Sequence, residues 1–220
     1  SGTSVDFTSS ATTFASAPVL AAGTVISSRT HDGTANAYFY FAGSTMNWED
    51  PGTDPTSASN VTIQTGTVEV TTATPVANNI DVKGVLDLKT ASTLKVNAVL
   101  TVKNGGTFRA GGATKPIVDE ATATSGWDFQ VESGGAVDIS ALDLRNPDRA
   151  GATNGITLQA GAVLTKLNNV DFTLGAPAST KYLRIQMTTG SFTLESCTFD
   201  GNQQYTVSSA VNSGLTVVML

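Results

Sequence analysis

The sequence predicts an all-β fold, a single-stranded right-handed parallel β-helix (solenoid) with an N-terminal β-rich cap. Three observations predict it. From Val61 onward, apolar residues recur in pairs two positions apart, which is the pattern of short strands with one buried face. The joints between these pairs are short, some of only two residues. In the C-terminal half the pattern repeats at a nearly constant period, because Leu144, Phe172 and Phe199 follow one another at intervals of 28 and 27 residues.

Short strands dominate the first part of the solenoid. A strand of three to five residues cannot bury its apolar face alone, so each coil needs its neighbours. Corners such as Lys83-Gly84 and Asn97-Ala98 separate the strands. The apolar pairs are Val61/Ile63, Val68/Val70, Ile80/Val82, Leu86/Leu88, Leu94/Val96 and Leu100/Val102.

Three longer segments, 127–146, 155–174 and 182–201, align as successive coils. Turn signals such as Asn154-Gly155 and Asp200-Gly201 occur once per repeat and not once per strand, which favours wound coils over hairpins. We expect Leu215-Thr216-Val217 to open a further coil at the position of Ile156-Thr157-Leu158, so that the solenoid, residues 61–220, is incomplete at its C-terminus. The first strands of the three coils carry Phe129/Val131, Ile156/Leu158 and Leu183/Ile185. Their last strands carry Ile139, Leu142 and Leu144, then Leu167, Val170 and Phe172, then Leu194, Cys197 and Phe199. We expect these nine last-strand residues, Phe108 and the apolar pairs from Ile80 to Val102 to point into the core.

Residues 1–60 differ from the rest and are expected to cap the solenoid. An open coil end exposes apolar side chains and unpaired backbone groups, which invites edge-to-edge pairing. The aromatic run Tyr38-Phe39-Tyr40-Phe41 is suited to cover such an end. Trp48 to Pro55 is expected to be a loop, since two prolines and a glycine interrupt any regular ladder.

Composition excludes several classes of function. Charged residues make up only 14% of the chain, and the formal net charge is −6. The 12 basic residues are scattered, whereas a nucleic-acid surface needs them clustered. No basic amphipathic helix and no long apolar span is visible, so neither membrane binding nor insertion is expected. The single cysteine, Cys197, excludes an internal disulfide and a multi-thiolate zinc site.

The segments Leu194 to Gly201 and Leu167 to Phe172, each with a small or polar residue among apolar ones, resemble the coils of the pectate-lyase-like right-handed parallel β-helix superfamily. Residues 48–112 also resemble an eight-glycine extracellular domain of surface proteins, through Trp48, Val61-Thr62-Ile63, Gly66-Thr67-Val68, Gly84-Val85-Leu86 and Gly105-Gly106-Thr107-Phe108. These resemblances imply a secreted or cell-surface protein.

The resemblance does not bring a catalytic set with it. The polygalacturonase-like motifs are absent: Arg184-Ile185 is followed by Gln186 where that family has lysine, and the single histidine, His31, lies outside the periodic region. Asp143 and Asp171 occupy matching positions in consecutive coils, about 4.8 Å apart. That spacing suits either a ligand-binding carboxylate pair or two outward, solvated side chains.

Two weaker sites complete the candidates. Glu49, Asp50 and Asp54 supply three carboxylates in one loop and so are candidate calcium ligands, although the two prolines there also fit a rigid surface turn. Trp48, in the same polar loop, is the candidate aromatic platform for a sugar. Asn60-Val61-Thr62 is a glycosylation sequon. No other cofactor is expected.

The strand at the C-terminus is the last candidate. Leu215, Val217, Val218 and Leu220 form an apolar, β-prone edge that we expect to contact either downstream chain or a neighbouring copy. The sequence therefore predicts a structural or adhesive extracellular module without catalysis, in a surface, sheath, filament or fibre protein. The alternative is a polysaccharide-binding module, or a non-catalytic fragment of a polysaccharide lyase or glycoside hydrolase. A polysaccharide-degrading β-helix enzyme is the third possibility, and the absence of a catalytic set argues against it.

Overall fold

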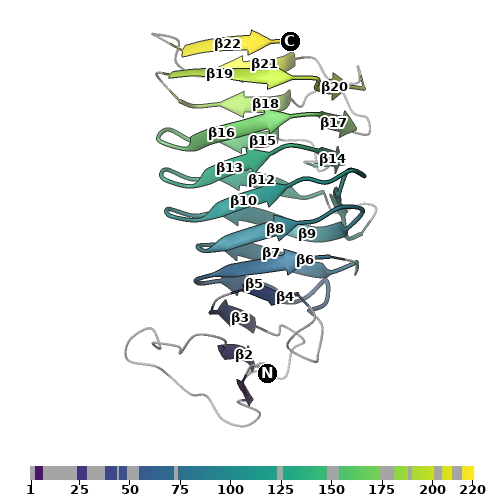
Figure 1. The fold of residues 1–220 in the computed structure, drawn as a ribbon, viewed down its shortest axis with the longest axis vertical. Coiled ribbons are helices and arrows are strands. Elements are labelled where there is room, and N and C mark those ends of the chain that lie inside the picture. The colour runs from purple at the N-terminus through teal and green to yellow at the C-terminus, as the bar shows by residue number, and fades with distance from the viewer. Residues whose placement is uncertain are drawn as a thin grey trace.

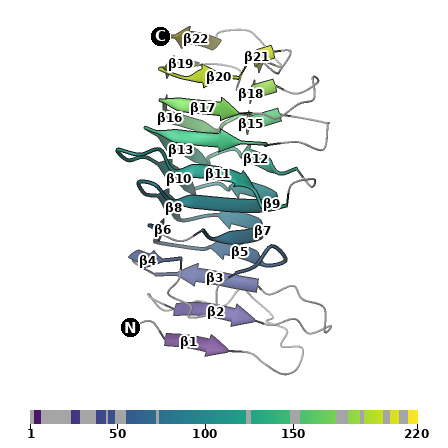
Figure 2. The same ribbon diagram turned by 90° about the vertical axis from the view of Figure 1, so that its right-hand side faces the viewer.

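A computed structural model describes residues 3–6, 24–28, 38–43, 45–48, 55–71, 74–122, 126–147, 154–173, 181–187, 190–200, 205–209 and 215–220. The described residues form strands and connecting turns, and the strands stack as the coils of a parallel β-helix (Figure 1). The predicted all-β solenoid is therefore confirmed. Figure 2 shows the stack running from β1 (Thr3–Asp6) at one end to β22 (Leu215–Met219) at the other.

One side of the solenoid is an eight-stranded parallel sheet, to which each coil contributes one strand. Along the chain its strands are β4 (Thr45–Asn47), β6 (Thr67–Val70), β8 (Val85–Leu88), β10 (Thr107–Ala110), β13 (Ala136–Ile139), β16 (Val163–Asn168), β19 (Gly190–Glu195) and β22.

The remaining strands form a second sheet that folds around the other two sides of the coils. One branch of this sheet contains β11 (Ile117–Glu120), β14 (Leu142–Arg145), β17 (Val170–Thr173) and β20 (Thr198–Phe199). The other branch contains β12 (Asp128–Val131), β15 (Asn154–Leu158), β18 (Lys181–Ile185) and β21 (Tyr205–Ser209). The strands nearer the N-terminus are β1, β2 (Thr24–Ser28), β3 (Tyr38–Ala42), β5 (Asn60–Ile63), β7 (Val76–Val82) and β9 (Thr93–Val102).

The long strand β9 explains how two branches arise from one sheet. Its first half pairs with β11 and its second half with β12, so the strand turns a corner at Asn97-Ala98. The coils also lengthen along the chain. Hydrogen-bonded side chains on adjacent coils are 18 or 19 residues apart near Asn60, but 27 apart for Asp171 and Thr198.

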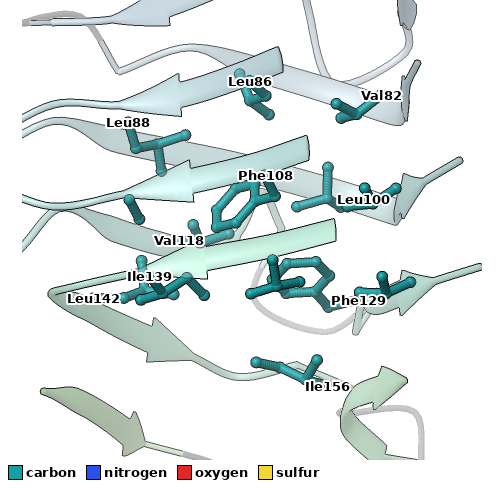
Figure 3. Packing of buried hydrophobic residues seen from close by; sticks show 14 of the residues in the cluster. Val82, Leu86, Leu88, Leu100, Phe108, Val118, Phe129, Ile139, Leu142 and Ile156 are labelled. Carbon is teal, nitrogen blue, oxygen red and sulfur yellow. The ribbon is translucent and has the colours of Figure 1, made fainter. Parts of the chain in front are cut away.

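The interior is one continuous apolar core (Figure 3). All six apolar pairs of residues 61–102 are buried, as the alternation predicts. Phe108 lies edge-on to Phe129 at 5.0 Å, and Phe172 stacks on Phe199 at 5.1 Å, so aromatic rings continue from coil to coil. Of the 18 core positions that the pattern predicts, two are only partly buried, Cys197 and Phe199; the other predicted positions are buried, namely Ile80, Val82, Leu86, Leu88, Leu94, Val96, Leu100, Val102, Phe108, Ile139, Leu142, Leu144, Leu167, Val170, Phe172 and Leu194.

Glycines form the corner that leads into the eight-stranded sheet. Gly105, Gly134 and Gly161 have φ values of 80°, 76° and 82°, a left-handed conformation that a side chain disfavours. The turns stack on one another, because the amide of Gly105 donates to the carbonyl of Gly134, and that of Gly134 donates to Gly161.

The parallel stack begins inside the segment that the sequence assigns to the cap. β3 pairs in parallel with β5, and β4 pairs in parallel with β6. β2 then adds to β3 in the antiparallel direction and β1 adds to β2. The coil arrangement therefore reaches back to Tyr38, and β1 and β2 lie beyond it.

The expected position of the last strand is wrong. β22 pairs with β19, not with β18, so Leu215-Thr216-Val217 occupies the eight-stranded sheet and not the position of Ile156-Thr157-Leu158. The latter position belongs to β21, where Val207 and Ser209 align with Leu183 and Ile185. Because Ser209 replaces the second apolar residue, β21 lacks the apolar pair by which the first strands of the other coils were aligned.

Candidate functional site

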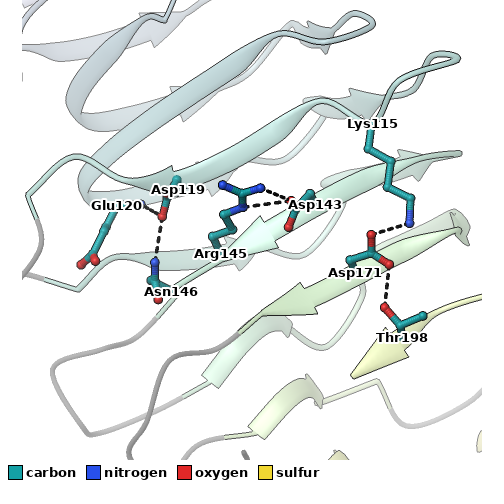
Figure 4. A network of polar contacts seen from close by, with 8 residues as sticks. All are labelled: Lys115, Asp119, Glu120, Asp143, Arg145, Asn146, Asp171 and Thr198. Atoms are coloured by element: carbon teal, nitrogen blue, oxygen red, sulfur yellow. Dashed lines mark hydrogen bonds and ion pairs between the residues drawn. The ribbon is translucent and has the colours of Figure 1, made fainter. Parts of the chain in front are cut away.

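Two of the predicted site residues, Asp143 and Asp171, lie in a cluster of outward polar side chains on β11, β14, β17 and β20 (Figure 4). Asp143 and Asp171 are register partners on adjacent strands, and Thr198 follows in the next coil. The predicted stacking of the two aspartates is confirmed. Their strands alternate inward and outward residues, which turns the apolar neighbours Leu142, Leu144 and Phe172 into the core.

Asp143 is held by the arginine two residues along its own strand. Arg145 donates from Nε and from Nη2 to Asp143 Oδ2, at 2.9 and 2.5 Å. The same hydrogen bond and charge raise the pKa of Arg145 above its ordinary value, although burial of Arg145 opposes them. The other oxygen of Asp143 is buried and accepts no hydrogen bond within the described part of the chain.

Asp171 binds different partners. Lys115 Nζ lies 2.7 Å from Asp171 Oδ2, and Thr198 Oγ1 donates to Asp171 Oδ1 at 2.6 Å. Burial acts to raise the pKa of Asp171, but hydrogen bonds from Lys115 and Thr198 and the charge of Lys115 outweigh it and lower the pKa. A carboxyl group with a lowered pKa is ionised at neutral pH and so is not suited to donate a proton.

The two aspartates bind separate cationic partners, and Asp171 is held in its ionised form. Hydrolysis by paired carboxylates needs one group with a raised pKa. Here each carboxylate instead carries its own cationic partner, Arg145 for Asp143 and Lys115 for Asp171. The arrangement is an ion-pair network along the coil stack.

The network continues on β11. Asp119 Oδ1 accepts from Asn146 Nδ2 at 3.0 Å and from the backbone amide of Glu120 at 2.8 Å. Asn146 has a φ of 49°, a conformation that asparagine tolerates better than most residues. This contact joins the end of one strand to the corner of the next coil.

The sequence did not identify the cationic partners. Arg145 could have been found, since it lies two residues from Asp143 and therefore on the same face of the strand. Lys115 could not, because it precedes β11 and reaches past β14 to Asp171 on β17. No local pattern encodes that reach.

Trp48 does not form an exposed sugar platform, and that prediction is wrong. Its side chain is 1% exposed and lies 5.8 Å from the ring of Phe41, within the apolar core. The backbone amide of Trp48 donates to the carbonyl of Glu69, which continues the pairing of β4 with β6. Proximity to a polar loop suggested exposure, but the residue still belongs to the register of the coil.

The candidate calcium ligands Glu49, Asp50 and Asp54 lie outside the described residues. Across the part of the chain that the structure describes, no group of three or more histidine, cysteine, aspartate or glutamate side chains is arranged to hold a metal ion.

The C-terminal strand is the terminal member of its sheet in the described structure, and β19 is its only partner there. Val217 packs against the core, whereas Val218 is 37% and Leu220 77% exposed. The side chain of Leu215 lies outside the described residues.

Cys197 is partly buried against the core, and burial raises the pKa of its thiol, which fits an unreactive cysteine.

Asn60, the asparagine of the sequon, belongs to a ladder of amides. Its Oδ1 accepts from Asn79 Nδ2 at 2.7 Å and from Asn78 Nδ2 at 3.4 Å, and Asn97 Nδ2 donates to Asn78 at 3.1 Å. The ladder joins successive coils at one corner of the solenoid.

Within the described ranges, no helix has the length and apolar character needed to cross a membrane. Comparisons with protein-family models, with curated proteins and with solved structures returned no match.

Proposed function

We propose that this chain is a structural or adhesive module of a secreted or cell-surface protein, and that it has no catalytic activity. The observation that supports this proposal is that outward-facing charged side chains form ion pairs between neighbouring coils. Lys103 Nζ lies 2.8 Å from Glu132 and 3.5 Å from Asp81, and Lys89 lies within 3.0 Å of Glu69. Lys115 extends the same pattern to Asp171.

These contacts support a stiff solenoid. Each exposed ion pair is worth at most about 1 kcal/mol, but pairs that form a network along a stack act together. Hydrogen bonding to Glu132 raises the pKa of Lys103, against the effect of burial, so this lysine remains charged at neutral pH. The repeat pattern of the coils resembles that of the pectate-lyase-like β-helix superfamily, and this resemblance supports the proposal of an extracellular module.

Polysaccharide binding is the second candidate. A row of polar residues follows the other side of the solenoid, with Thr62, Asp81, Thr101, Gln130 and Thr157 on successive coils. Thr101 is buried, and the other four are partly exposed. Adjacent members are about 4.8 Å apart, which suits repeated hydrogen bonding to an extended glycan. The partner would be an extracellular polysaccharide.

Affinity electrophoresis in polygalacturonate, alginate and xylan tests the two candidates, together with assays for new reducing ends and unsaturated products. A structural module is neither retained by these polymers nor able to cut them. Retention that is lost in a Gln130→Ala variant, with unchanged thermal unfolding, would establish the binding candidate instead. Product formation in any of the three polymers would refute the absence of catalysis.

A further inference from the structure

The outer face of the eight-stranded sheet carries a row of charges of alternating sign. Asp87, Arg109, Asp138 and Lys166 are register partners on β8, β10, β13 and β16. Leu86, Phe108 and Val137, which precede the first three of these residues, are buried, so their charged neighbours face outward. On β16 the register shifts by one residue after Leu164, and Lys166 is exposed. Arg109 Nε lies 3.8 Å from Asp138 Oδ2 of the same chain, and these two side chains remain 50% and 38% exposed, whereas Asp87 is 16% exposed.

A second row beside the charged one has no charge. On the same four strands it consists of Val85, Thr107, Ala136 and Val163. Val163 is 48% exposed, which makes it one of the few exposed large apolar residues in the described structure. The face therefore has an uncharged, mainly apolar row next to a charged row, both parallel to the solenoid axis.

We propose that this face binds the same face of a second copy of the chain in antiparallel orientation. A two-fold axis parallel to the strands, midway between β10 and β13, brings β8 of one copy opposite β16 of the other. Asp87 then meets Lys166, and Arg109 meets Asp138, each pair twice in the dimer. A two-fold axis that runs along the charged row, with the two solenoids parallel, would instead place each charge opposite itself.

The apolar row obeys the same symmetry. The rotation keeps the position along the strand and reverses the order of the coils, so Val85 meets Val163 and Thr107 meets Ala136. A two-fold interface must be complementary to itself, and both rows satisfy that condition.

The neighbouring charges agree with this register. Lys89 contacts both Glu69 and Asp87, so these three residues together keep one negative charge near β8. That charge faces the exposed Lys166 of the second copy. Glu195, one coil beyond Lys166, comes diagonally opposite Lys89, which is again a pair of opposite charges.

The size of the face indicates a weak dimer. Eight strands at about 4.8 Å and four to five residues at about 3.3 Å cover roughly 500 Å² on each copy. The total, roughly 1,000 Å², lies near the lower limit for a specific interface, so we expect a dissociation constant in the micromolar range.

Sedimentation equilibrium of the full chain tests this proposal over a range of protein concentrations, at low and high ionic strength. The native protein is expected to dimerise, more weakly at high salt. Lys166→Glu creates two like-charge contacts and should raise the dissociation constant about tenfold or more. Arg184→Glu changes the net charge equally but lies on β18, outside this face, and should leave dimerisation unchanged.

Mixing two variants tests the register itself. Lys166→Glu and Asp87→Lys should each dimerise poorly alone. A mixture of the two should regain native affinity, because the negative charge introduced in one variant then meets the positive charge introduced in the other. Val163→Glu, at an exposed position, provides a disruption that does not depend on the folding of Asp87→Lys. A monomeric native protein, association that is insensitive to Lys166→Glu and Val163→Glu, or no recovery in the mixture of folded variants would overturn the proposal.

Discussion

At the scale of single residues, aromatic contacts near the C-terminus pack two neighbouring coils together. Phe172 is 1% exposed, stacks on Phe199 and meets the ring of Tyr182 edge-on at 5.9 Å. Tyr182 itself is buried, and its hydroxyl donates to Asp200. Two neighbouring coils therefore pack against one ring.

Replacing Phe172 with alanine should lower the free energy of unfolding by about 3–5 kcal/mol, since a buried aromatic ring is lost and a cavity remains. Urea unfolding followed by circular dichroism measures the effect. Thr173→Ala, at the exposed neighbouring position, is the matched control and should change stability by less than about 0.5 kcal/mol. Equal stability of the two variants would contradict the core role of Phe172.

The ionisation of Asp171 should make the free energy of unfolding depend on pH. Its pKa is lower in the folded state than the ordinary value of 3.8, so the ionised form stabilises the fold. This contribution is complete above the unfolded-state pKa and is lost as the pH falls through the folded-state pKa. Asp171→Asn should therefore be less stable than the native protein at neutral pH, and the difference should shrink below pH 3.8.

Urea midpoints of the native protein and of Asp171→Asn, taken from neutral pH to below pH 3.8, measure this effect. Lys115→Gln should cause a similar loss at neutral pH, because it removes the cationic partner. A constant difference between the native protein and Asp171→Asn at all pH values would show that the ion pair is not the cause.

At the scale of elements, the corner turns fix how closely the coils approach. A Cβ atom at Gly106 would lie 2.0 Å from the backbone carbonyl oxygen of Val82, in the preceding coil. At Gly135 the equivalent distance to Val102 is 2.5 Å. These contacts involve backbone atoms, which cannot move without shifting a strand.

Gly106→Ala should therefore cost about 2 kcal/mol or more, as the two coils must separate locally. Gly105→Ala meets open space but forces alanine into a φ of 80°, which should cost about 1 kcal/mol. Gly105→Asn should cost less than Gly105→Ala. Thermal unfolding of the three variants measures the order, and a harmless Gly106→Ala would refute the close approach of the coils.

At the scale of the whole molecule, each coil of the solenoid is stabilised by the coils on either side of it. Among the described strands, each coil pairs with the coil before and the coil after it, so removal of an end leaves a strand edge exposed. At the N-terminal end, β2 covers β3 through antiparallel pairing.

Deletion of residues 1–37 should expose the edge of β3 and cause concentration-dependent aggregation. Light scattering and sedimentation velocity compare the truncated and full chains at equal concentration. A truncated protein that stays monomeric and keeps the thermal stability of the full chain would show that β1 and β2 do not protect this edge.

The sequence by itself determined the fold and most of the core. Alternating apolar pairs can be read locally, because side chains on a strand point to opposite faces in turn. The pairing of Asp143 with Asp171 followed from the repeat alone, as equal positions in successive coils become neighbours.

Only the tertiary structure decided which polar groups meet and which strands occupy irregular coils. Lys115 reaches Asp171 across an intervening strand, and Trp48 is buried despite its polar sequence neighbours. β21 takes its place with a serine where earlier coils have an apolar residue, so β22 lies one sheet further along than the repeat predicts. The physical reason is that hydrogen bonding between whole strands and the filling of the core fix the register of a coil, even where a single side chain does not signal it.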